Sequence, residues 1–360
     1  MGKTMIIPFF IPHGGCPFTC VFCNQWEISG QSEELQPEAF SRRVQSFLAT
    51  AQVTEDTRVE AAFFGGSFTG LPVEVQLKWL KEGLNAIQKG KIAGLRLSTR
   101  PDYVDDGILR RLLAHGVTTI ELGVQSLVNE VLLETRRGHT YEDILRATEI
   151  IRKYPVQLGY QLMLGLPGDK EEYIFLTARR AVEARPDFIR IYPTVVLKGT
   201  LLAQWYEQGI YHPLSLSAAV TYAAHWLATF SLYDIPVIRI GLQAAENLSF
   251  TRDLLAGPYH PAFGELVEGY LMREQILCFL KKINFREKEL ILYINPRDYS
   301  KVVGQKRCNI GFFKEHLKIR EIKVVPDPAI PNQDIGILVS SSCHPLILAR
   351  QEFLEKYRIK

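Results

Sequence analysis

The chain has 360 residues, 47% of them hydrophobic, and carries a net charge of +3. This length and apolar content predict one large core and a smaller second module. Six cysteines in a chain of this length, three of them clustered, exclude a disulfide-stapled scaffold and favour a reducing compartment, the cytoplasm.

The sequence predicts no membrane-spanning helix. Its longest apolar segment, residues 218–232, contains His225 and Thr229 and is shorter than the roughly 20 residues needed to cross a bilayer. The N-terminal apolar run is interrupted by Pro8 and Pro12, so we expect no secretory signal there.

Short apolar runs alternate with longer amphipathic segments over residues 1–265. The runs predict strands at 5–10, 59–64, 95–98, 119–122, 157–164 and 188–192, with a weaker one at 237–241. Helices are predicted between them at 37–51, 72–88, 106–115, 141–153 and 170–184. This order is typical of βαβ units and a parallel sheet. Six or seven such units favour a partial or full barrel, whose chemistry gathers at the carboxyl ends of the strands.

Three cysteines, Cys16, Cys20 and Cys23, follow the first predicted strand. A closed zinc or iron–sulfur site takes four protein ligands, whereas three thiolates leave one iron of a four-iron cluster open to a small molecule. Phe22 would give such a cluster an apolar wall. The alternative is a zinc site closed by His13, although zinc ligands usually come as two separated pairs. We favour the cluster.

Polar or glycine-rich segments follow each of the next five predicted strands. They are residues 65–70 (GGSFTG), 98–102 (STRPD), 121–126 (ELGVQS), 163–168 (MLGLPG) and 192–200 (YPTVVLKGT). Each signal is weak alone. Their recurrence at successive strand ends indicates a binding site on that face of the sheet.

Other charged residues are interpreted as architecture. Asp169 and Glu172 have the spacing of a helix capping box. Residues 136–139, which contain Arg136, Arg137 and His139, are predicted to form a solvated loop between two helices. Glu121 is either a site residue or a satisfied core carboxylate.

Together these segments resemble the radical S-adenosylmethionine (SAM) enzymes, and within them the radical-SAM domain of Elongator's catalytic subunit. The C-x3-C-x-aromatic-C cysteine pattern carries the first resemblance, and residues 65–69, 99–102, 121–126 and 191–200 carry the second. The resemblance implies a partial (β/α)6-type barrel, a [4Fe–4S] cluster and bound SAM. It also implies an electron donor such as flavodoxin or ferredoxin.

The resemblance also implies roles for individual residues. Cys16, Cys20 and Cys23 would ligate three irons, and the amino and carboxylate groups of SAM the fourth. The remaining contacts to SAM would come from Gly65, Gly66 and Ser67 (amino group), Ser98 and Gln125 (carboxylate or ribose), and Met163 and Tyr192 (adenosine).

Two features depart from the resemblance. Related chains often have an acidic residue where this one has Gln161, which puts a ribose contact there in doubt. Elongator's catalytic subunit carries an acetyltransferase domain after the barrel, and residues 266–360 do not resemble one. We therefore do not expect the acetyl-transfer step from this sequence.

Residues 266–360 are predicted to form a second, α+β domain. A helix is predicted at 266–280, strands at 289–294 and 319–325, helices at 296–303 and 309–317, and a helix at the C-terminus. Residues 281–320 hold eleven basic and four acidic side chains. The order of elements resembles KH-type RNA-binding domains, which clamp single strands with a GXXG loop. Here Gly304, Gln305, Lys306 and Arg307 take that place, with Arg307 instead of the second glycine.

The function that we predict is a radical SAM enzyme that modifies RNA, tRNA first and ribosomal RNA next. One alternative is radical chemistry on a small molecule, as in coproporphyrinogen dehydrogenases. Another is a non-enzymatic RNA-binding iron–sulfur protein. A methyl-transferring variant would use a separate cysteine as carrier, for which Cys343 is the candidate.

Overall fold

The computed structural model describes residues 4–17, 19–25, 36–54, 56–242, 253–339, 342 and 344–357. The chain forms two units. The first comprises residues 1–214 and 243–258, and the second residues 215–242 and 259–360.

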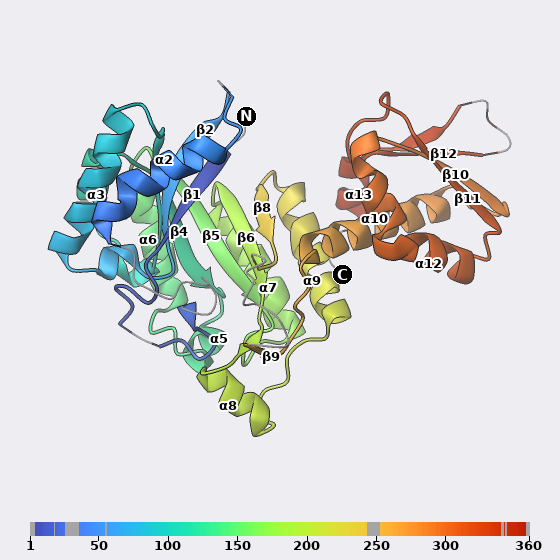
Figure 1. Ribbon diagram of the computed structural model, residues 1–360. Coiled ribbons are helices and arrows are strands. Elements are labelled where there is room, and N and C mark those ends of the chain that lie inside the picture. The colour runs from blue at the N-terminus through green and yellow to red at the C-terminus, as the bar shows by residue number, and fades with distance from the viewer. Residues whose placement is uncertain are drawn as a thin grey trace. The chain divides into compact units, whose positions relative to one another are not determined.

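Six parallel strands in chain order form the curled sheet of the first unit (Figure 1). They are β1 (Thr4–Phe10), β2 (Arg58–Phe64), β3 (Gly94–Thr99), β4 (Val117–Gln125), β5 (Gln157–Leu164) and β6 (Phe188–Pro193). Every predicted strand is confirmed, and short apolar runs are typical of strands in a parallel sheet that is covered on both faces. A short antiparallel pair, β7 (Val196–Leu197) and β9 (Leu254–Ala256), completes the unit's strands.

Helices follow the strands of the first unit, and Figure 1 shows α2, α3 and α6 along one side of the sheet. The α-helices are α2 (Phe40–Thr50), α3 (Val73–Gln88), α4 (Asp106–Ala114), α5 (Asn129–Glu134), α6 (Tyr141–Ile151), α7 (Glu171–Ala184) and α8 (Leu201–Glu207). Single 3-10 turns are η1 (Pro37–Ala39), η2 (Phe68–Gly70) and η3 (Pro101–Tyr103). The sequence pattern predicted all of them except α5, α8 and the turns, which are too short for a helical period to show.

Alternate residues of the strands point to opposite faces of the sheet, one apolar and one charged. Leu95 and Leu97 on β3 are fully buried and belong to the apolar core. Arg96 and Ser98, between and after them, point to the other face. A parallel sheet whose inner face carries charges needs those charges to be paired there.

Glu121 is the centre of that pairing. Its side chain is fully buried and accepts hydrogen bonds from Arg96 (2.8 Å), Arg190 (3.0 Å) and Gln161 (2.8 Å). Arg96 also donates to Glu60 at 3.0 Å. Glu121 is thus a satisfied core carboxylate, one of the two interpretations that the sequence left open.

The strand register brings the polar strand ends to one edge of the sheet. Ser98 lies beside Glu121 across β3 and β4, and Met163 lies beside Tyr192 across β5 and β6. Gln125 ends β4 next to Leu162 of β5. Because all six strands run the same way, residues from distant parts of the sequence share this edge.

The second unit is built on helices α9 (Leu216–Leu232), α10 (Phe263–Lys282) and α13 (Arg350–Lys356), which pack on one another. Strand β8 (Val237–Ile240) also belongs to it. A four-stranded sheet has the order β11 (Glu321–Pro326), β10 (Glu289–Ile294), β12 (Ile335–Leu338), β13 (Leu346–Leu348). Strands β10 and β11 are parallel and the other pairs antiparallel.

Two helices connect β10 to β11, as the sequence predicted. They are α11 (Tyr299–Val303), preceded by the turn η4 (Pro296–Asp298), and α12 (Cys308–His316). The turn η5 (Gln305–Arg307) separates them. No helix in the described part of the chain has the length and apolar character to cross a bilayer.

Candidate active site at the cysteine loop

Residues 11–25 form the segment after β1 that we call the cysteine loop. Its thiols are all free: Cys16 is exposed, Cys20 is buried and Cys23 is partly buried. Burial and the neighbouring Cys20 raise the pKa of Cys23 to about 12, and burial also raises the pKa of Cys16. Such thiols stay protonated at neutral pH until a metal displaces their protons.

Main-chain contacts hold the cysteine loop against the loop that follows β2. The N–H groups of Ile11 and His13 donate to Phe64 (2.8 Å) and Gly65 (2.9 Å), and the N–H of Ser67 donates to the carbonyl of Gly14 (2.8 Å). A Cβ placed on Gly66 would lie 2.3 Å from the Gly14 oxygen. The two loops therefore touch backbone to backbone, which only glycine permits here.

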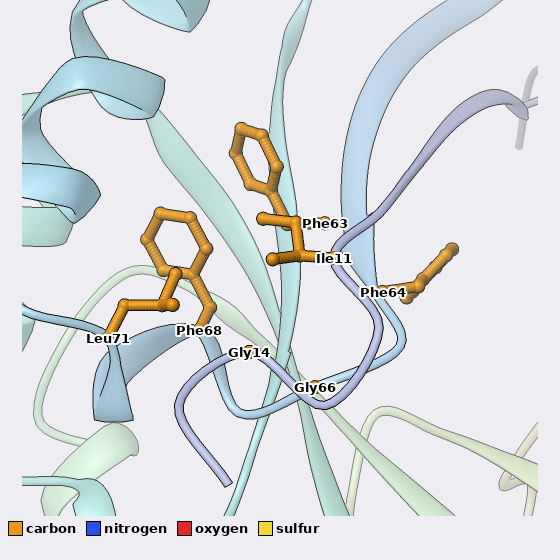
Figure 2. Close-up of a pocket in the computed structure, with 7 residues that line it drawn as sticks. All are labelled: Ile11, Gly14, Phe63, Phe64, Gly66, Phe68 and Leu71. Carbon is orange, nitrogen blue, oxygen red and sulfur yellow. The ribbon is translucent and has the colours of Figure 1, made fainter. Parts of the chain in front are cut away.

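Figure 2 shows this contact, with Gly14 and Gly66 side by side below the rings of Phe63 and Phe68. The small pocket there has no room for a water molecule. Pockets for drug-sized ligands start at roughly 300 Å³. We therefore regard it as part of the contact between loops and not as a ligand site.

The residues predicted to hold the SAM amino group take part in this contact. Gly65 has a positive φ of 91° and Gly66 packs on Gly14. The Ser67 hydroxyl is buried, lies 3.0 Å from that of Thr99 and accepts an N–H from Arg100 at 3.2 Å. Their contact to SAM stays a prediction.

Ser98 and Gln161 are joined within the sheet. The Gln161 amide donates to the Ser98 hydroxyl at 3.0 Å and to Glu121 at 2.8 Å. An acidic residue at position 161 would instead face Glu121 with a like charge. The departure of Gln161 from the family pattern thus has a local reason, because an amide can donate where a carboxylate cannot.

The other predicted cofactor contacts surround the cysteine loop. Phe22 is buried in an apolar cluster with Cys20 and Val21, and Met163 packs against that cluster. Tyr192 lies across the strand pair from Met163, and Gln125 ends β4 with a positive φ of 65°. The fold therefore brings these residues to the same end of the sheet, whereas their roles stay predictions.

The interpretation of residues 136–139 as a solvated loop was wrong for two residues. Arg136 is exposed, but Arg137 and His139 are buried. Arg137 donates to the Cys20 sulfur at 2.9 Å and to the Gly123 carbonyl at 2.6 Å. The sequence cannot show which of the two arginines is buried. Arg137 is buried because the folded cysteine loop lies against it, whereas Arg136 is exposed.

The predicted capping box at Asp169 was also wrong. Helix α7 begins after Lys170, whose side chain makes no capping bond, and Asp169 lies before it. The Asp169 carboxylate accepts the N–H of Gly165 at 3.1 Å, and the hydroxyl of Tyr211 donates to the Gly165 carbonyl at 2.6 Å. Asp169 therefore fixes the loop after β5. The methyl-carrier candidate Cys343 lies outside the described residues.

The Gly304–Arg307 loop lies between α11 and α12 of the second unit. Gln305, Lys306 and Arg307 are exposed, and Lys306 and Arg307 have positive φ angles of 51° and 62°. A Cβ on Gly304 would meet the Cys308 sulfur at 2.6 Å. Among the described residues, neither Lys306 nor Arg307 takes part in any of the salt bridges, so their charges face solvent.

Two family models together match most of the chain. The radical SAM superfamily matches residues 10–181, and the Radical_SAM C-terminal domain matches residues 186–273. The chain belongs to the radical SAM superfamily. It is accordingly an enzyme, and the cofactors of its superfamily are a [4Fe–4S] cluster and SAM.

Similar proteins include tRNA-modifying enzymes. The tRNA uridine(34) acetyltransferase of Dehalococcoides mccartyi is 29% identical over 230 residues, which are 55% of this chain and 50% of that protein. Elongator complex protein 3 of Mus musculus is 29% identical over 248 residues, 58% of this chain and 45% of that protein. This radical SAM chain thus spans about half the length of such relatives.

A solved structure supports the fold. The archaeal Methanocaldococcus infernus Elp3 with an N-terminal deletion superimposes with a TM-score of 0.58 at 21% identity, covering 80% of this chain and 65% of that one. The α/β fold, a partial barrel followed by a small domain with a sheet, is therefore confirmed.

The described residues fit a four-iron cluster, because three free thiols lie on one loop. In the ranges that the structure describes, no three His, Cys, Asp or Glu side chains gather around one metal position. His13, the fourth ligand of the zinc alternative, accepts the N–H of Gln25 at 3.0 Å. A four-iron cluster spreads its thiolates over different irons and does not need them around one ion. Cys16, Cys20 and Cys23 are the residues that would hold it.

Replacing Gly66 by alanine should disrupt the cysteine loop. The new Cβ would meet the backbone of Gly14, which can move only with the loop. We expect G66A to lose most of the iron and sulfide that the wild type binds after anaerobic reconstitution, measured per chain. G311A is the matched control, because its Cβ would meet nothing within 4 Å. Full iron content in G66A would contradict the proposed contact.

Asp169 should make stability depend on pH. Burial raises its pKa to about 7, above the value of about 3.9 in an unfolded chain. The folded state therefore binds this proton more tightly, and stability falls as pH rises from about 4 to about 7. We expect the Tm of D169N to exceed that of the wild type by a margin that grows between pH 5 and pH 8. A margin that stays constant over this range would show the carboxylate to be ionised throughout.

Proposed function

We propose that this chain cleaves SAM reductively at a [4Fe–4S] cluster and uses the resulting radical to modify RNA, with tRNA as the first candidate substrate. The observation that carries the proposal is the cysteine loop at the carboxyl ends of β1 to β6, with three free thiols next to the polar strand ends. Superfamily membership and the tRNA-modifying relatives support it.

In this proposal Cys16, Cys20 and Cys23 hold three irons, and the fourth stays available to SAM. When bound, the cluster supplies the electron that splits SAM into methionine and a 5′-deoxyadenosyl radical. The electron comes from a donor such as flavodoxin or ferredoxin. The protein orients SAM through the strand-end residues, among them Gln125 and Tyr192.

The apolar cluster around Phe22 has a second task in the proposal. A carbon radical abstracts hydrogen from any donor within reach, so water and loose side chains must be kept away from it. Val21, Phe22 and Met163 line the cysteine loop with apolar surface. They would exclude water while the target nucleotide is presented.

The second unit supplies RNA binding in this proposal. Residues 281–320 combine eleven basic with four acidic side chains, and Lys306 and Arg307 extend from an exposed loop between two helices. Cationic side chains at such a loop attract phosphates. The names of the relatives describe acetyl transfer, and this chain spans only about half the length of those proteins, so we confine the proposal to the radical step.

Replacing Cys20 by alanine should abolish the chemistry. C20A removes one of three cluster ligands, so we expect loss of the iron–sulfur absorption and of 5′-deoxyadenosine formation after reduction with dithionite. C278A, a partly buried cysteine on α10, is the control and should keep both. Nucleoside masses of tRNA and ribosomal RNA should then differ between cells that make the wild type and cells that make C20A. SAM cleavage without any change in RNA masses would favour the small-molecule alternative.

Reversing the charges of the Gly304–Arg307 loop should weaken RNA binding alone. We expect K306E/R307E to raise the Kd for tRNA by about tenfold or more and to make binding less dependent on salt, because two phosphate contacts are lost. SAM cleavage without RNA should be unchanged. K89E/K91E reverses two exposed charges of the first unit and serves as the control. If both double variants bind RNA equally, the loop is not the binding site.

A further inference from the structure

Arg137 is a buried cation that contacts a cluster cysteine. It lies in the segment between α5 and α6, and only 7% of the residue is exposed. One terminal nitrogen, Nη1, donates to the Cys20 sulfur at 2.9 Å, and the other, Nη2, donates to the carbonyl of Gly123 at 2.6 Å. The guanidinium is thus fixed by β4 on one side and the cysteine loop on the other.

The turn that carries Arg137 is itself fixed on the cysteine loop. Thr135, just before it, is fully buried, donates its hydroxyl to Val131 at 2.6 Å, and accepts the N–H of Val21 on its carbonyl at 3.3 Å. Arg136 and Gly138 both have positive φ angles, 53° and 72°, which turn the chain sharply around Arg137. Two consecutive residues of the cysteine loop, Cys20 and Val21, therefore contact this one turn.

Within the part of the chain that the structure describes, Arg137 has no carboxylate partner. Its neighbour Arg100, by contrast, is paired with Asp102 at 2.8 Å. His139, two residues on, offers no negative charge either. A buried cation without an anion is costly. The group that the structure places against the guanidinium is the Cys20 sulfur, which would be a thiolate with a cluster bound.

We propose that Arg137 is a positioning residue that raises the reduction potential of the cluster by holding its guanidinium on the Cys20 sulfur. The proposal rests on the proposed function, since it needs the cluster. One-electron reduction adds a negative charge to a group that already carries three thiolates. A fixed cation stabilises the reduced state more than the oxidised one, most strongly where water is excluded. Hydrogen bonds to the sulfurs act on the potential in the same direction.

The test compares R137Q and R137K with R136Q. Arg136 is the exposed neighbour in the same turn, so R136Q removes an equal charge without a contact to the cysteine loop. Each protein is reconstituted anaerobically, its iron and sulfide are measured, and its cluster is titrated with dithionite without SAM while the reduced signal is followed by electron paramagnetic resonance. A purely structural role of Arg137 would change the iron content but not the potential.

We expect R137Q to hold the cluster and to be reduced at a more negative potential, with a change of about tenfold in the equilibrium constant of reduction, or about 59 mV for one electron. R137K, which keeps the charge and loses the two-pronged geometry, should lie between R137Q and the wild type, and R136Q should match the wild type.

Three results would overturn one proposal or the other. A wild type without iron and sulfide would end the proposed function itself. A cluster in R137Q with the wild-type potential would end only the role of Arg137. If neither R137Q nor R137K took up a cluster, Arg137 would be a structural support of the cysteine loop and not a determinant of its potential.

Discussion

Close contact between two backbone segments fixes the position of the cysteine loop. Gly66 lies so near the backbone of Gly14 that it cannot carry a side chain, and the hydrogen bonds of Ile11, His13 and Ser67 run across the same contact. Three thiols on a short loop act together only if that loop has one conformation. Backbone packing provides it without using any side chain that a cofactor would need.

In the part of the chain that the structure describes, buried charges are paired within the sheet, around Glu121, but not beside the cysteine loop, at Arg137. Inside the sheet, the carboxylates of Glu60 and Glu121 balance the charges of Arg96 and Arg190, so removing one partner would leave a buried charge unpaired. Next to the cysteine loop, Arg137 has no carboxylate among the described residues and contacts a thiol instead. The Glu121 network and the Arg137 contact therefore differ in net charge. The balanced network links neighbouring strands, whereas the positive charge of Arg137 would act on a cluster bound at Cys20.

The predicted cluster ligands and the exposed basic loop lie in different units of the chain. The cysteine loop and all strand-end residues lie in the first unit, and the Gly304–Arg307 loop lies in the second. Radical generation requires a dry, apolar surrounding, while phosphate binding requires exposed cations. One surface cannot satisfy both, so under the proposed function the division between units would make the two activities separable by substitution.

Local sequence was sufficient for the strands, for most helices and for the cysteine loop. Runs such as residues 157–164 form strands because their apolar residues must be buried, and the spacing of Cys16, Cys20 and Cys23 restricts the chemistry to few metals. The sequence placed Gly65 and Gly66 at the end of a strand, but it did not reveal the backbone of Gly14, which requires a glycine at position 66. Asp169 was misjudged because its carboxylate accepts the N–H of Gly165, four residues earlier, whereas a capping box would use the residues that follow it.

Tertiary structure alone decided the surroundings of those cysteines. Arg137 is separated from Cys20 by more than a hundred positions, and nothing near it in sequence distinguishes it from the exposed Arg136. Whether an arginine faces solvent or a sulfur depends on which distant loop covers it. The sequence by itself determined which groups can bind a metal, and the fold decided which charge they meet, because electrostatic interactions depend on distance in space and not along the chain.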